Sequence, residues 1–195
     1  MNDATEPKPA RALAPERLPV NSSDKSPGHR AEPTLQDASK INAPAARPKP
    51  KSARRRSREV ALQGLYEWLI SGADAKVINA HMREQDDFNQ CDVAHFEALL
   101  HGCIAEAPLI DAVLAKHVDR KTTQLSPIEH GVLMIGVYEL KHCIAIPYKV
   151  AINEAVELAK SFGGTDGHKY VNGVLDKAAG ELRTLEVDAA RAARR

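Results

Sequence analysis

The chain has 195 residues, 43% of them hydrophobic, and a formal net charge of +1 at pH 7. This length and composition predict one folded domain with an ordinary core. A balance so close to zero excludes a uniformly basic or acidic protein, so only a local cluster of charge could serve a polyanionic partner. No apolar run approaches the roughly 18 residues of a membrane span, and no secretory signal opens the chain; we expect a cytoplasmic protein without a membrane partner.

The first fifty residues differ in composition from the rest of the chain. They hold nine of the twelve prolines, one glycine and no aromatic residue. Such a segment cannot bury enough apolar surface to offset the entropy lost on ordering. We therefore predict a disordered Pro-rich tail over 1–50, a folded domain over 51–185 and a frayed C-terminal tail over 186–195.

Within the predicted domain, apolar residues recur at helical spacing, and no alternating β-branched run bounded by turns is found. The sequence therefore predicts an all-α domain. We expect seven helices with short connections, over 53–70, 74–85, 92–106, 108–119, 127–143, 147–162 and 165–182. The fifth is apolar in nearly every direction, which predicts a position at the centre of the bundle.

Two of these helices begin with cap residues. Ser126, Pro127 and Glu129 form the pattern of a capping box, in which the serine and the glutamate satisfy each other's backbone N–H groups. The last helix opens at Thr165-Asp166, and either side chain can serve as its N-cap.

The pattern of reactive residues does not indicate an enzyme. The sequence contains no phosphate-binding glycine loop after a strand, no His-Glu-x-x-His and no Gly-x-Ser-x-Gly. Its three cysteines fit neither a disulfide framework nor a zinc-finger spacing. We therefore expect no catalytic residues, no metal and no cofactor.

A run of cations stands at the start of the first predicted helix. Its five members are Lys51, Arg54, Arg55, Arg56 and Arg58. Cations at a helix N-terminus oppose the helix dipole, so helix stability does not account for them. Such a run can be merely solvated, but guanidinium groups beside open helix N–H groups also suit a nucleic-acid backbone.

Two tyrosines are expected near cations. Helical geometry places Tyr66 on the flank of the first helix that carries Arg55, and Tyr170 away from the apolar face of the last helix. Each could be an ordinary residue at the edge of the core. Aromatic rings beside cations are also what single-stranded RNA needs, because every unpaired base offers a face for stacking.

Three segments together resemble the NusB transcription-antitermination family. They are residues 54–66, which contain RRRSRE and ALQGLY, residues 147–160 (PYKVAINEAVELAK) and residues 168–177 (HKYVNGVLDK). The resemblance covers about 52–183 and implies two three-helix bundles packed across one another. It also implies binding of the boxA RNA of ribosomal RNA leaders, a heterodimer with the ribosomal protein NusE, and work in an antitermination complex on RNA polymerase.

The resemblance also assigns residues. It places the arginine run and Tyr66 in an RNA-contacting first helix, Asp166, Lys169 and Tyr170 in a second RNA-contacting region, and Glu129 on the side that faces the protein partner. For Glu129 and Asp166 a capping role stays open beside the binding role.

The hypothesis is therefore a non-enzymatic antitermination factor that binds boxA RNA together with NusE. The alternative is a protein-interaction module that does not bind RNA directly. A homodimer of the free protein is also possible, and the sequence does not decide between monomer and dimer.

Overall fold

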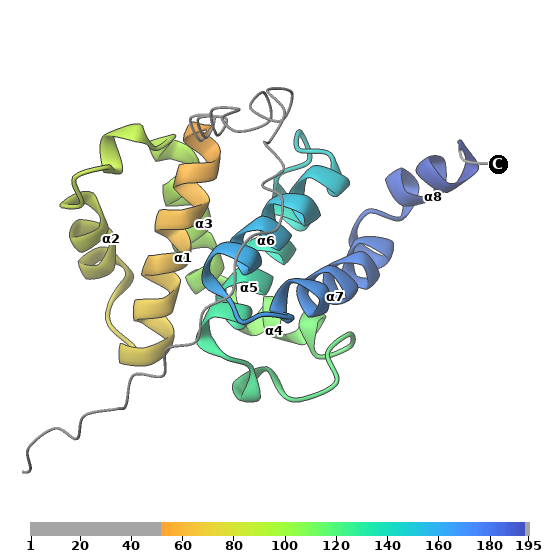
Figure 1. Ribbon diagram of the computed structural model, residues 1–195, viewed down its shortest axis with the longest axis horizontal. Coiled ribbons are helices and arrows are strands. Elements are labelled where there is room, and N and C mark those ends of the chain that lie inside the picture. The colour runs from red at the N-terminus through yellow and green to blue at the C-terminus, as the bar shows by residue number, and fades with distance from the viewer. Residues whose placement is uncertain (1–51, 194–195) are drawn as a thin grey trace, which may run out of the picture. The chain divides into compact units, whose positions relative to one another are not determined.

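The structure is a computed structural model in which residues 52–193 are described (Figure 1). The predicted tail 1–50, Lys51 and the last two residues lie outside the described residues. Within 52–193 the chain forms eight α-helices, two short 3-10 helices and no strand. They are α1 (Ala53–Ser71), α2 (Ala75–Arg83), η1 (Phe88–Gln90), α3 (Val93–Ala105), α4 (Ala107–Leu114), η2 (Thr122–Gln124), α5 (Pro127–His142), α6 (Tyr148–Phe162), α7 (Gly167–Leu182) and α8 (Thr184–Ala192).

The helices pack as two groups of three. Helices α1, α2 and α3 form one bundle, and α5, α6 and α7 form the other, while α1 packs on α5 and joins the two (Figure 1). Helix α4 packs on α5 and connects the first bundle to the second. The all-α prediction and the arrangement in two bundles are confirmed. In the part of the chain that the structure describes, no helix is both long and apolar enough to cross a membrane.

Local sequence signals define both ends of α1. The Ser52 hydroxyl accepts a hydrogen bond from the Arg55 N–H at 3.2 Å, as expected of an N-cap. At the other end Gly72 adopts a left-handed conformation with φ of 66°, and its N–H bonds to the Trp68 carbonyl. Only glycine adopts this conformation without strain, so Gly72 fixes where the helix ends.

Helix α5 is the central helix, as its sequence predicts. The capping box forms: Ser126 Oγ accepts from the Glu129 N–H at 3.2 Å, and Glu129 Oε2 accepts from the Ser126 N–H at 3.4 Å. Every residue from Gly131 to Val137 is buried, so neighbouring helices surround the middle of α5 on all sides. This explains why its apolar residues show no single face.

The C-terminal end differs from the prediction. Instead of a frayed tail, α8 follows α7 directly, and Val187 is buried against the core. The Glu186 carboxylate accepts a hydrogen bond from the Tyr148 N–H at 3.0 Å and so supplies the N-cap that α6 lacks in its own sequence. The sequence does not show this contact, because the two residues are 38 positions apart.

Gly136 lets α5 and α7 approach closely. A β-carbon at this position would lie 2.6 and 2.8 Å from the two terminal carbons of Leu175, which is completely buried on α7. Leu175 is held in a packed core and has little room to shift.

We therefore expect Gly136→Ala to lower the free energy of unfolding by about 1–3 kcal/mol, despite the better helix propensity of alanine. Gly180→Ala is the matched control, because a β-carbon there meets nothing within 4 Å; it should raise stability by up to about 1 kcal/mol. Urea unfolding followed by circular dichroism measures both. Equal stability of the two variants would contradict the close packing of α5 on α7.

Candidate nucleic-acid interface

The four arginines at the start of α1 differ in exposure. The exposed fraction of the side chain is 57% for Arg54, 31% for Arg55, 16% for Arg56 and 4% for Arg58. Successive residues of a helix point about 100° apart, so the run turns from solvent toward the core. The predicted cationic strip is therefore only partly a surface feature.

Arg58 points into the protein. Its Nη2 lies 2.8 Å from Glu139 Oε1, and its Nη1 lies 3.4 Å from Glu154 Oε2. His95 Nε2 on α3 lies 3.0 Å from the same Glu139 oxygen. The prediction that Arg58 contacts RNA is replaced by a positioning role, because its guanidinium holds α1 against α5 and α6 and does not face solvent.

Arg56 is also largely engaged inside the protein. It forms ion pairs with Glu59 Oε2 at 3.0 Å and with Asp87. Glu59 is buried, so its charge is compensated by Arg56 and by Arg55, whose Nε lies 3.8 Å away. Most of the Arg56 side chain is therefore unavailable to an external anion.

Arg54 and Arg55 remain at the surface. Arg54 Nε donates to Asp92 Oδ2 at 3.4 Å, and Asp92 also N-caps α3 through the His95 N–H. That backbone hydrogen bond, together with Arg54, holds the pKa of Asp92 below its usual value. Arg55 reaches across to α6, where its Nη2 lies 3.7 Å from Glu157 Oε2.

The start of α7 carries the second predicted region. Asp166 and Lys169 are exposed and form an ion pair of 2.8 Å with each other. The Asp166 side chain makes no capping hydrogen bond. The sequence leaves a capping role and a binding role open for Asp166, and in this structure its side chain does not cap the helix.

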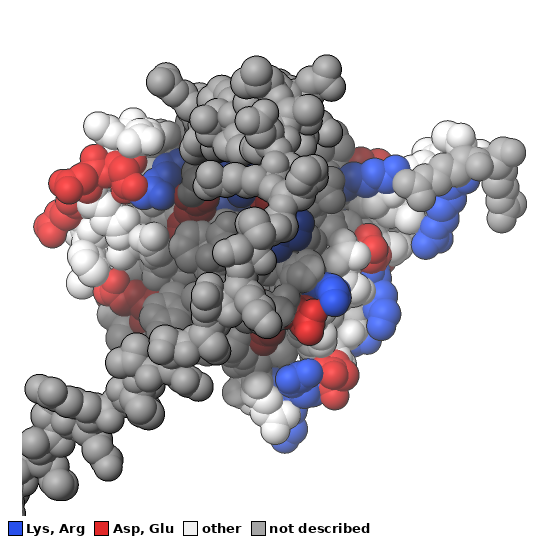
Figure 2. Space-filling model, in the orientation of Figure 1, with Lys and Arg blue, Asp and Glu red and all other residues white. Residues whose placement is uncertain are grey.

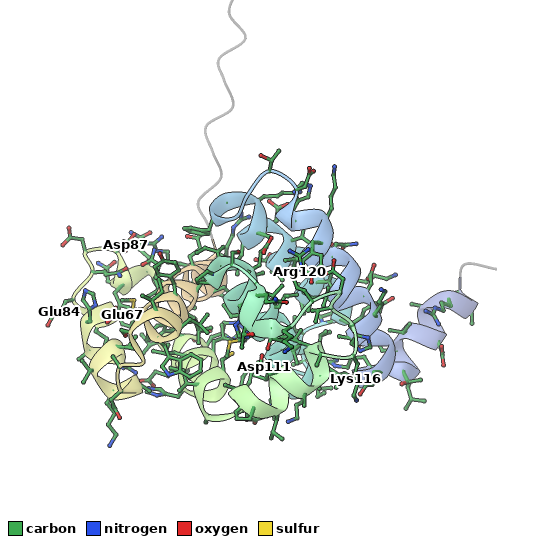
Figure 3. All side chains as sticks on the ribbon, turned by 90° about the horizontal axis from the view of Figure 1, so that it is seen from below. Glu67, Glu84, Asp87, Asp111, Lys116 and Arg120 are labelled. Atoms are coloured by element: carbon green, nitrogen blue, oxygen red, sulfur yellow. The ribbon has the colours of Figure 1, made fainter. Side chains whose placement is uncertain are left out.

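Tyr170 is half-buried and is held by the loop that precedes α5. Its hydroxyl donates to Asp119 Oδ1 at 3.0 Å, and the Arg120 guanidinium lies 5.3 Å from the centre of its ring. Burial, followed by the hydrogen bond to Asp119, raises the pKa of Tyr170. Figure 3 shows Arg120 on the side of the molecule where α7 lies, away from Glu67 and Asp87. Arg120 is not among the residues predicted from the sequence, because nothing in the local sequence indicates that this loop lies against Tyr170 of α7.

Tyr66 borders an apolar groove. Its side chain and that of Phe162 are both partly exposed, at 42% and 37%, and line a groove of about 160 Å³. The lining residues are Leu62, Gln63, Tyr66, Ile128 and Phe162. The helical pattern of α6 predicts Phe162 on the buried face, yet it lies at the last residue of the helix, where the core ends.

Helix α6 connects the two predicted regions. Its Glu157 pairs with Arg55 from α1, and the helix packs along α7. Near the same helix start, a β-carbon at Gly167 would come within 3.3 Å of Glu129 Oε1, and the Glu129 charge acts on Arg120. The residue predicted to face a protein partner therefore adjoins the second predicted RNA region.

Positive and negative side chains both occur around the second predicted RNA-contacting region. Figure 2 shows Lys and Arg side chains next to Asp and Glu side chains around the start of α7 and the loop before α5. Among residues 52–193 no group of three His, Cys, Asp or Glu residues is placed to hold a metal ion.

The fold and this surface define a class: small all-α proteins of two three-helix bundles that present cations and aromatic rings from α1 and α7. The sequence pattern of the NusB family matches residues 55–180. The chain belongs to the NusB family. Its relatives are transcription antitermination proteins, a non-enzymatic class, in agreement with the expectation from the motifs.

Two curated relatives illustrate the match. The transcription antitermination protein NusB of Ralstonia nicotianae is 56% identical over 152 residues, which is 77% of this chain and 97% of that protein. The protein of the same name from Bordetella pertussis is 56% identical over 149 residues, which is 74% of this chain and 97% of that protein.

Solved structures share the fold. T. maritima NusB aligns with a TM-score of 0.59 and 28% identity, covering 68% of this chain and 94% of that one. A structure of the antitermination factors NusB and NusE in complex with dsRNA aligns with a TM-score of 0.58 and 22% identity, covering 66% of this chain and 97% of that one. At 22% identity, this second match shows a shared fold and nothing more.

The difference between Arg58 and Arg54 can be tested directly. Arg58→Met should lower the free energy of unfolding by about 3–5 kcal/mol, because it leaves the Glu139 carboxylate buried without its guanidinium partner. Arg54→Met removes an exposed pair and should change stability by less than about 1 kcal/mol. Both are measured by urea unfolding. A similar small effect for the two variants would mean that Arg58 is not held inside the protein.

Proposed function

We propose that this protein is a transcription antitermination factor that binds boxA-type single-stranded RNA of ribosomal RNA leaders together with the ribosomal protein NusE. The single observation that carries the proposal is that α6 packs against both helices that present the predicted contacts, α1 with Arg54 and Arg55 and α7 with Lys169 and Tyr170. Membership of a family of antitermination proteins supports it.

The exposed groups suit the chemistry of RNA. Arg54 and Arg55 stand in the first turn of α1, where open backbone N–H groups and guanidinium forks both favour phosphate oxygens. Tyr170 offers a ring for base stacking, and Arg120 lies over that ring with its own planar group. Arg120 therefore joins the predicted contacts, while Arg56 and Arg58 hold the helix that presents them.

The protein partner is proposed to dock beside the RNA. Glu129 lies next to the start of α7, and the apolar groove between Tyr66 and Phe162 offers a surface for apolar side chains. A solved protein of the same fold is paired with NusE and RNA. We infer the same heterodimer here, acting in the cytoplasm within an antitermination complex on RNA polymerase. The groove also suits the alternative, a protein-interaction module without RNA binding, and a homodimer of the free protein could use it.

Salt dependence separates the two readings. If about four phosphates are neutralised, log affinity for a short boxA-like RNA should fall against log salt with a slope of about −3. Fluorescence anisotropy with a labelled oligonucleotide measures it, and the same RNA annealed to its complement is the control. Affinity that is absent or insensitive to salt would favour the protein-interaction module.

The aromatic ring of Tyr170 should contribute to RNA affinity by stacking on a base. Tyr170→Ala should weaken RNA binding by about 1–3 kcal/mol without changing the helical circular-dichroism signal. Tyr170→Phe is the matched control, because it loses the hydrogen bond to Asp119 but keeps the stacking surface, and it should bind almost as well as the parent. If the alanine variant binds RNA like the parent, Tyr170 is not part of the interface.

The partner is tested by a pull-down with purified NusE, with and without boxA RNA. We expect NusE to be retained, and more strongly when RNA is present, because the two surfaces adjoin at Glu129 and Gly167. Retention of NusE with no effect of RNA would support the alternative reading, and no retention in either case would remove NusE from the proposal.

A further inference from the structure

One carboxylate lies between cations that come from two helices. Glu157 on α6 is within ion-pair distance of Arg55 of α1 and of Lys160 of its own helix. Lys160 is not among the residues that the sequence assigns to RNA contact. Helix α6 packs against both α1 and α7, which carry the two proposed RNA-contacting regions.

Each oxygen of the Glu157 carboxylate lies near a different cation. Lys160 Nζ lies 2.7 Å from Oε1, and Arg55 Nη2 lies 3.7 Å from Oε2. The hydrogen bond from Lys160, with further contributions from Arg55 and His168, lowers the pKa of Glu157. The carboxylate is thus charged at neutral pH, and an anion of two oxygens is already bound at this point in the free protein.

A phosphodiester group presents the same feature, one negative charge shared by two oxygens on one central atom. Lysine and arginine bind it through the same hydrogen bonds that they give to a carboxylate. Glu157 is 42% exposed, so it holds its cations at the surface, where an RNA backbone that runs from α1 to α7 would pass.

We propose that Lys160 is a further RNA-contacting residue, and that with Arg55 it forms a phosphate-binding position that Glu157 occupies in the free protein. This inference rests on the proposed function and adds a specific site to it. When RNA binds, a phosphate then replaces the Glu157 carboxylate beside these cations. Glu157 therefore competes with any RNA that cannot make the remaining contacts.

Replacing the competing charge should strengthen RNA binding. We expect Glu157→Gln to raise the affinity for a boxA-like single-stranded RNA about three- to tenfold at low salt, because one repulsive charge beside a phosphate is removed. The slope of log affinity against log salt should steepen by about 0.7, the value for one additional phosphate contact on a single strand. An unrelated single-stranded RNA should gain at least as much, because the competitor acts on any phosphate backbone.

Glu181 on α7 provides a matched control. It is 38% exposed and, like Glu157, pairs with an exposed lysine, Lys116 at 2.5 Å; His117 lies 3.2 Å from its other oxygen. It lies eleven residues beyond Tyr170, about three turns along the helix. Glu181→Gln removes the same charge away from the proposed site and should leave RNA affinity within about twofold of the parent, as long-range effects are screened.

A second pair of variants tests the cations themselves. In the Glu157→Gln background Lys160 no longer has a carboxylate to neutralise, so an effect of Lys160→Gln on affinity reports a contact with RNA. We expect Lys160→Gln to lower the affinity at least threefold, whereas Lys116→Gln in the Glu181→Gln background should have no effect.

The outcomes are distinct. If the parent binds RNA and Glu157→Gln binds equally or more weakly, the phosphate position is wrong, because the carboxylate then plays no part or serves to orient Arg55. The same holds if Lys160→Gln has no effect in the Glu157→Gln background. If the parent does not bind single-stranded RNA at all, the proposed function fails, and the inference fails with it.

Discussion

The structure depends on one buried ion cluster that joins the two bundles. Arg58 of α1 meets the Glu139 carboxylate of α5, and side chains of α3 and α6, His95 and Glu154, lie against the same pair. A buried charge is costly unless it is paired, so any packing of these helices that separated Arg58 from Glu139 would be disfavoured. The cluster therefore fixes the direction in which α1 starts and, with it, the place of Arg54 and Arg55.

This constraint explains why four similar arginines differ in exposure and in ion-pair partners along the first turns of α1. Helical rotation turns the later members toward buried carboxylates and leaves the earlier ones in solvent. Even the exposed members have acidic neighbours, Asp92 and Glu157, in the folded protein. Cations and carboxylates are therefore paired on this surface of the folded protein.

Much of the fold could be predicted because its signals are local. The periodicity of apolar residues predicts α1 to α7, and the Ser126–Glu129 pattern predicts the capping box that the structure contains. The inward direction of Arg58 could not be predicted, because its partner Glu139 lies 81 residues away. The same is true of Arg120, which reaches Tyr170 only after the loop before α5 has folded over α7. The roles of the candidate site residues remain predictions.

The contacts at the junction of α7 and α8 indicate which segments of the protein unfold together. Arg183 donates to the carbonyls of Leu140 and Cys143 at the end of α5, and it pairs with Glu186, which bonds the first N–H group of α6. The last turn of α5, the first turn of α6 and the base of α8 thus share one set of bonds and form a single cooperative unit. In amide hydrogen exchange these three segments should lose protection together, and α8 should not unfold independently as an appended tail.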